Sequence, residues 1–144
     1  MAGRKLNATQ ALTLLAPTTI GAAVTGALGT AVDGLAAMES ATLQATFSYG
    51  AGGTTVKAWV QTSFDQGNTW VDIANFAFTT AAAKKISSVR AVTVVAAAYV
   101  PTDATLADDT IKDGVLGDRL RVKYTSTGTY TGATSLAIHC VTKG

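Results

Sequence analysis

Few side chains in this chain are of a type that could carry out chemistry. The one histidine, His139, and the one cysteine, Cys140, stand side by side near the C-terminal end. Nucleophilic catalysis by a thiol needs a base within hydrogen-bond reach, and that base is usually a histidine. The residues around them alternate as in a strand, where neighbouring side chains point to opposite faces, so the two do not form a dyad. We therefore predict no catalytic residue and no enzymatic activity.

Acidic residues gather in one late segment between Pro101 and Asp118. Carboxylates are the hard oxygen ligands that Ca²⁺ prefers, but their spacing matches no EF-hand loop. The sequence has no Cys/His cluster for structural zinc and no glycine-rich loop followed by Lys-Ser/Thr for a phosphate. We predict no metal and no cofactor, and calcium binding by this loop stays open as an alternative. The acidic residues are Asp103, Asp108, Asp109, Asp113 and Asp118.

Basic residues recur at every second position of the segment 118–126, which places them on one face of a predicted strand. Such a stripe could meet an acidic partner surface, or it could be a solvated face that keeps the strand from pairing wrongly. Exposed aromatic residues such as Trp59 and Tyr130 offer a possible sugar-stacking platform. Trp59 does not share the face of Ala58 and Val60, so either it lies outside or both faces of its strand are covered. The candidate partner contacts are Arg4, Lys5, Leu6, Asp103, Asp108, Asp109, Arg119, Arg121 and Lys123.

Composition restricts the class of protein. The 144 residues suffice for one domain with a single core; 48% are apolar, and the 14% that are charged fall well below the usual quarter. A net charge of +2 without a basic run argues against nucleic acid as a partner. No apolar run reaches the roughly 18 residues of a membrane span, and we expect neither a membrane nor Sec export. One cysteine allows no internal disulfide.

The element that the sequence predicts most clearly is a β-hairpin. Strand-forming residues 55–62 and 71–76 flank a turn that contains Asp, Gly and Asn. The Asp65 carboxylate is short enough to accept backbone N–H groups a few residues on, and Gly67 tolerates positive φ. The turn residues are Ser63, Asp65, Gly67, Thr69 and Trp70. Their pattern resembles the Asp-box of sialidases, but a propeller repeats that motif in every blade and here it occurs once.

About eight short segments have strand character, with turn signals between them. We expect residues 42–74 to form a three-stranded antiparallel meander, and residues 86–100 to form one long strand buried on both sides. Residues 101–117 are the longest segment without predicted structure. The fold class is therefore all-β: an antiparallel two-sheet sandwich, jelly-roll-like, with an extended N-terminal arm. The arm covers residues 1–9, and a single β-sandwich domain covers residues 10–144.

Residues 40–144 also resemble a family. The hairpin 60–73, the segment 114–124 and the turn 128–134 together look like the small β-sandwich proteins of tailed bacteriophages, most of all the jelly-roll cement or decoration proteins of the capsid. The resemblance implies a non-enzymatic virion protein that binds the outside of the capsid and stabilises contacts between capsomers. It implies the major capsid protein and further copies of this chain as partners, and assembly in the host cytoplasm.

Two other classes of function remain open. A tail, neck or receptor-binding sandwich would contact host carbohydrate through an aromatic groove. A hydrolase on a sandwich scaffold would need a pair of carboxylates buried in a cleft.

Overall fold

The computed structural model describes residues 9–144, which form an all-β chain with antiparallel pairing throughout. The predicted arm, residues 1–9, lies outside the described residues except for Thr9. The strands are β1 (Gln10–Thr19), β2 (Val24–Leu28), β3 (Ser40–Ser48), β4 (Ala51–Gly52), β5 (Thr55–Thr62), β6 (Val71–Phe78), β7 (Ala83–Arg90), β8 (Leu120–Thr127), β9 (Tyr130–Thr131) and β10 (Ser135–Lys143).

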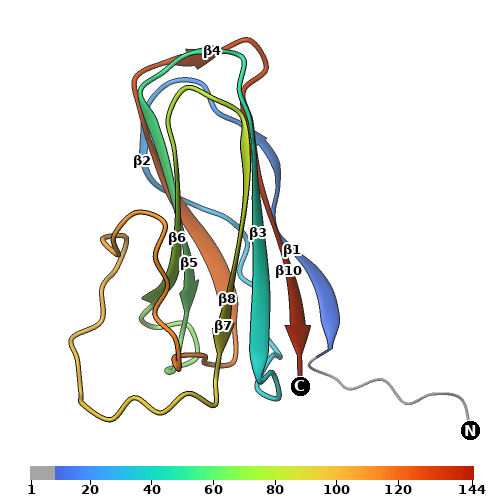
Figure 1. Ribbon diagram of the computed structural model, residues 1–144, viewed down its shortest axis with the longest axis vertical. Helices are drawn as coiled ribbons and strands as arrows, with labels where there is room; N and C mark the ends of the chain where they lie inside the picture. The colour runs from blue at the N-terminus through green and yellow to red at the C-terminus, as the bar shows by residue number, and fades with distance from the viewer. Residues whose placement is uncertain (1–8) are drawn as a thin grey trace, which may run out of the picture.

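The chain forms two four-stranded sheets, which lie face to face, as can be followed in Figure 1. Sheet A has the order β1-β10-β3-β7, and sheet B has the order β2-β8-β5-β6. One cluster of buried apolar side chains fills the space between them and draws on both sheets, with Leu43, Phe47 and Ile138 from sheet A and Val60 and Val122 from sheet B. The prediction of an all-β protein with antiparallel sheets is confirmed.

Alternation along the strands accounts for this packing. In β3, Leu43, Ala45 and Phe47 are buried while the residues between them are partly exposed. The last strand, β10, buries Leu136, Ile138 and Cys140 in the same way. Successive strand residues point to opposite faces, so each alternating segment buries one face in the core.

Successive strands change sheet at almost every connection; the hairpin of β5 and β6 is the exception among the eight strands of the two sheets. The predicted pairing of residues 55–62 with 71–76 is therefore right. The predicted three-stranded meander is wrong, because β3 pairs with β10 and β7 in the other sheet. The chain crosses between sheets at residues 49–54, where β4 pairs with β9.

The predicted long strand over residues 86–100 is also wrong. β7 ends at Arg90, and a loop without regular strands runs from residue 91 to residue 119; we call it the long loop. It swings out from the end of β7 in Figure 1 and returns past β6 to the start of β8. Its first residues are apolar but exposed: Val94 is 83% exposed and Val100 is 89% exposed. The apolar composition that predicted burial instead gives this loop an apolar surface.

Candidate functional site

The long loop covers the outer face of sheet B, and a buried carboxylate holds it there. Asp72 of β6 is 3% exposed. It accepts hydrogen bonds from five donors: Gln61 Nε2 at 2.9 Å, Thr102 Oγ1 at 2.7 Å, and the backbone N–H groups of Ala104, Thr105 and Leu106 at 2.9, 3.0 and 3.1 Å. Four of the five donors belong to the loop, so Asp72 fastens the loop to the sheet.

A second buried residue, Gln61 of β5, extends this contact. Its Nε2 donates to both Asp72 and Asp103, and its Oε1 accepts from Arg121 Nε at 2.9 Å. Lys123 Nζ also donates to Asp103, at 3.0 Å. Burial raises the pKa of Asp103, but the hydrogen bonds from Gln61 and Lys123 outweigh burial and hold that pKa below its usual value. Lys123 of the predicted basic stripe therefore contacts the chain's own acidic loop, and Arg121 of the same stripe contacts Gln61, which in turn binds that loop.

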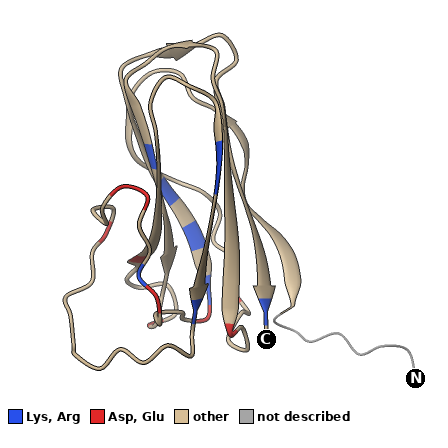
Figure 2. Cartoon of the chain, in the orientation of Figure 1, with Lys and Arg blue, Asp and Glu red and all other residues tan. Residues whose placement is uncertain are grey.

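The other loop carboxylates are paired in the same manner. Asp108 pairs with Lys57 at 3.0 Å, and Asp109 pairs with Lys85 at 2.8 Å. Asp113 accepts the backbone N–H of Arg90 and the hydroxyl of Thr93, and these hydrogen bonds lower the pKa of Asp113 to about 2. In Figure 2 the acidic and basic segments accordingly lie close together around the loop and sheet B.

The remaining stripe residue, Arg119, pairs with its neighbour Asp118 at 2.9 Å. Within residues 9–144 no group of three or more His, Cys, Asp or Glu side chains could hold a metal ion. The candidate contacts Arg4, Lys5 and Leu6 lie outside the described residues. Asp103 and Lys123 are thus brought together as partners, whereas Asp108 and Asp109 pair with Lys57 and Lys85, which were not among the candidates. All of these contacts hold the long loop in place.

Both candidate residues for a sugar-stacking platform are buried. The expected exposure of Tyr130 is wrong, and Trp59 follows the alternative in which both faces of its strand are covered. Trp59 is 6% exposed because the long loop lies over it, and its Nε1 donates to Leu106 O at 3.0 Å. Tyr130 is 2% exposed, and its ring packs edge-on against Phe47 with the centroids 5.8 Å apart. Neither ring offers a face on which a sugar could stack.

The structure places the five turn residues in one hydrogen-bonded loop between β5 and β6. Asp65 accepts from the backbone N–H and the hydroxyl of Thr69 and from the hydroxyl of Ser63. These hydrogen bonds lower the pKa of Asp65 to about 2, and the one from the Thr69 hydroxyl has the largest effect. Gly67 has φ +88°, and its carbonyl accepts from Trp70 Nε1 at 3.1 Å. The turn is architectural, and Trp70 also supports the Arg121 guanidinium, which lies 4.3 Å from its ring centroid.

His139 and Cys140 fall on opposite faces of β10. His139 is exposed on the outer face of sheet A, while Cys140 is buried, and burial raises the pKa of its thiol to about 12. Such a thiol is protonated and unreactive at neutral pH.

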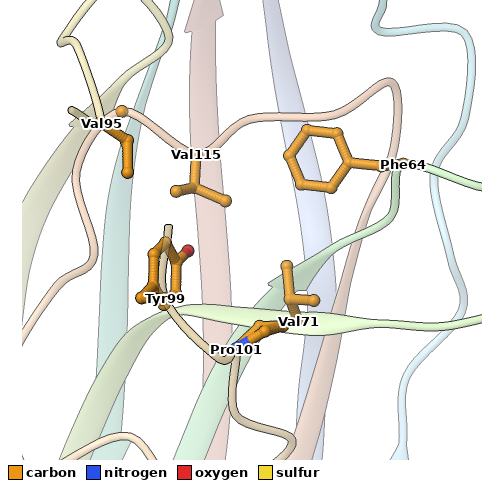
Figure 3. Close-up of a pocket in the computed structure, with 7 residues that line it drawn as sticks. Phe64, Val71, Val95, Tyr99, Pro101 and Val115 are labelled. Carbon is orange, nitrogen blue, oxygen red and sulfur yellow. The ribbon is translucent and has the colours of Figure 1, made fainter. Parts of the chain in front are cut away.

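Sequence reasoning missed one surface altogether. We define the apolar patch by Phe64, Val92, Val94, Val95 and Val100, whose exposed fractions run from 39% to 89%. Two of these residues, Phe64 and Val95, also line an open cavity of about 320 Å³. Figure 3 shows their side chains around it with those of Val71, Tyr99, Pro101 and Val115. The length of the apolar run 86–100 could have indicated this surface, because the run far exceeds the five or six residues of an average strand.

Residues 9–144 contain no helix of the length and apolar character that a membrane crossing needs. No protein-family model, curated protein or solved structure matches the chain.

Proposed function

We propose that this chain is a non-enzymatic structural protein of a tailed-phage virion, a jelly-roll protein that binds the outside of the capsid and stabilises contacts between capsomers. The strand orders support the jelly-roll classification. A jelly roll consists of two four-stranded antiparallel sheets, and its chain passes repeatedly from one sheet to the other. The orders β1-β10-β3-β7 and β2-β8-β5-β6 have this character.

The apolar patch is the observation that carries the binding role. Ten successive residues, 91–100, contain no charged side chain, and Val94 and Val100 are more than four-fifths exposed. Exposed apolar side chains that gather on one segment of a folded protein favour a role in association. The charged groups nearby are largely paired within the chain, so the patch is free to meet an apolar surface of the major capsid protein or of a sister copy.

Co-sedimentation with capsid shells that lack this protein tests the proposal. We expect saturable binding at a fixed ratio to the major capsid protein, and shells that withstand higher temperature when the sites are filled. The double variant Val94→Asp/Val100→Asp should bind at least tenfold more weakly, because each charge must lose its water to enter the interface. Thr129→Asp, in the exposed turn between β8 and β9, is the control and should bind as the wild type does.

The outcomes separate the patch from the function. If the wild type ignores shells but sediments with tails, the function moves to the tail or neck. If the wild type binds shells and the double variant binds equally well, the capsid function stands and the patch is not the contact.

A further inference from the structure

The middle of the outer face of sheet A is exposed and carries no formal charge. Residues that pair across neighbouring strands share a face, so the outward side chains fall into rows across the sheet. The two middle rows are His139–Gln44–Ile86 and Val141–Thr42–Ser88. Ile86 is 63% exposed and Val141 is 42% exposed. The middle of this face is therefore an uncharged and partly apolar surface.

This middle region is hollowed. An open hollow of about 230 Å³ lies there, and Thr42, Gln44, Ile86, His139 and Val141 are among the residues that line it. Its apolar walls come from Ile86 and Val141, while the Gln44 amide and the His139 imidazole can donate or accept hydrogen bonds. The hollow can thus receive an apolar or neutral polar side chain from a partner.

Basic residues stand at both ends of the middle rows. Lys84 lies in the next row at one end, and Lys143 and Arg90 share the next row at the other end. The strand geometry puts Lys84 and Arg90 about 20 Å apart along β7, and Lys143 and Arg90 about 10 Å apart across the sheet. In Figure 2, blue segments accordingly lie along β7 and at the end of β10. No acidic residue occupies these rows of described residues, and Glu39 lies just before β3.

Ion pairing within the chain leaves these basic groups largely open. The ion pairs of residues 9–144 all use carboxylates of the long loop. Arg90 takes part in one of them, with Asp113 at 3.3 Å, but its side chain is still 64% exposed. Lys84 and Lys143 have no ion pair with any described residue. The face therefore keeps an excess of positive charge.

The arrangement determines the kind of partner that fits. An uncharged centre with charges at its rim is the usual anatomy of a protein–protein interface. Its complement is a protein surface with a neutral centre and acidic residues at both ends. A second copy that docked through the same face would bring basic residues against basic residues. The rows hold no Phe, Tyr or Trp on which the bases of a nucleic acid could stack.

We propose that the outer face of sheet A binds an acidic surface of a different protein. This binding depends neither on the capsid function nor on the apolar patch. The long loop covers the outer face of sheet B, so the two surfaces lie on opposite sides of the sandwich. One copy of the chain can therefore contact two partners at once.

The test uses the full ¹⁵N-labelled chain and a blocked acidic peptide that stands in for the partner surface. The peptide has two glutamates at each end of a run of alanine and leucine, long enough to space its acidic ends about 20 Å apart when extended. Titration should shift the NMR signals of the Gln44, Ser88 and Lys143 amides saturably and leave the Trp59 amide in place. The same peptide with glutamine in place of glutamate should bind about tenfold more weakly. Equal binding of the two peptides overturns the proposal.

Matched variants show whether the charges of this face make the contact. Lys84→Gln/Lys143→Gln removes two exposed charges that have no ion pair, so the fold should be retained and binding of the acidic peptide should weaken about fivefold. Thr30→Glu/Thr129→Glu lowers the net charge by the same two units at exposed positions outside sheet A, and it should bind like the wild type. Equal losses in the two double variants would mean that only the net charge matters, and the proposal then fails.

Two further measurements decide against other occupants. If single-stranded oligothymidylate of the same charge shifts the same amides and binds more tightly than the acidic peptide, the partner is a nucleic acid and the proposal is overturned. Sedimentation equilibrium over a range of concentrations examines self-association. A dimer whose stability Lys84→Gln/Lys143→Gln changes would assign this face to a second copy and overturn the proposal as well. A monomer that binds the acidic peptide at this face supports it.

Discussion

The outer faces of the two sheets differ in how far the rest of the chain covers them. Sheet B is covered by the long loop, and its outward residues Trp59, Gln61 and Asp72 are buried. On sheet A, by contrast, Thr42, Ile86 and His139 stay exposed in the described structure. In both sheets the outward residues alternate along the strands with residues that point into the core. In sheet B, however, the outward polar residues include the carboxylate of Asp72 and the amide of Gln61, each of which binds several groups at once. Polar residues that face outward on a strand can therefore act as anchors for a distant segment instead of facing water.

The comparison predicts its largest effect at Asp72. Asp72→Ala leaves the loop donors Thr102, Ala104, Thr105 and Leu106 without their acceptor, and we expect the free energy of unfolding to fall by about 3–5 kcal/mol. Denaturant unfolding measures the loss, and hydrogen exchange should show faster exchange at Ala104 and Leu106. Gln44→Ala on the outer face of sheet A is the control and should change stability by less than about 0.5 kcal/mol. Similar losses in both variants would contradict the difference between the faces.

A smaller effect is expected where the loop returns to sheet B at Gly117. Its N–H donates to Thr62 Oγ1 at 2.8 Å, and a Cβ there would overlap the backbone oxygen of Ser63. Gly117→Ala should push the loop end away and lower the free energy of unfolding by about 2–4 kcal/mol. Gly21→Ala, where a Cβ meets nothing within 4 Å, is the matched control and should be nearly neutral. A Gly117→Ala melting temperature equal to that of the control would show that the loop end is not held here.

Acid should loosen the contact between the long loop and the Arg90 end of β7. The pKa of Asp113 is about 2 in the folded chain against an ordinary 3.8, so its contacts with Arg90 and Thr93 stabilise the fold fully above about pH 4 and are lost as the pH falls toward 2. The melting temperature should drop across this window, and the Arg90 amide signal should titrate near pH 2. Asp113→Asn should show a smaller drop. An equal drop would assign the acid sensitivity to other carboxyls, of which Asp65 is the first candidate.

The smallest effect is predicted on the outer face of sheet A. Val141 is 42% exposed on β10, and Val141→Thr should change the free energy of unfolding by less than about 0.5 kcal/mol, because this side chain stays in water. Thermal unfolding of the purified chain measures it. A loss above 1 kcal/mol in dilute solution would mean that this face is covered as well.

Local patterns in the sequence identified several elements correctly. Alternation located β3, β8 and β10 and their buried residues, because a strand with one face in a core needs period-two hydrophobicity whatever its neighbours are. The turn from Ser63 to Trp70 was equally readable, since its hydrogen bonds join residues at most four positions apart. Such features depend on backbone sterics and short-range bonding.

The sequence by itself therefore determined the all-β fold class and the positions of the strands that alternate most clearly. Only the tertiary structure decided which strands pair and which apolar run is buried. After β3 the chain crosses to the other sheet at residues 49–54, so β3 pairs with β10 and β7 and not with β5. No local signal in the sequence distinguishes that crossing from a hairpin turn. Residues 91–100 are apolar enough for a core, but the core is already filled by the two sheets, and the buried Asp72 holds the following residues of the loop outside it.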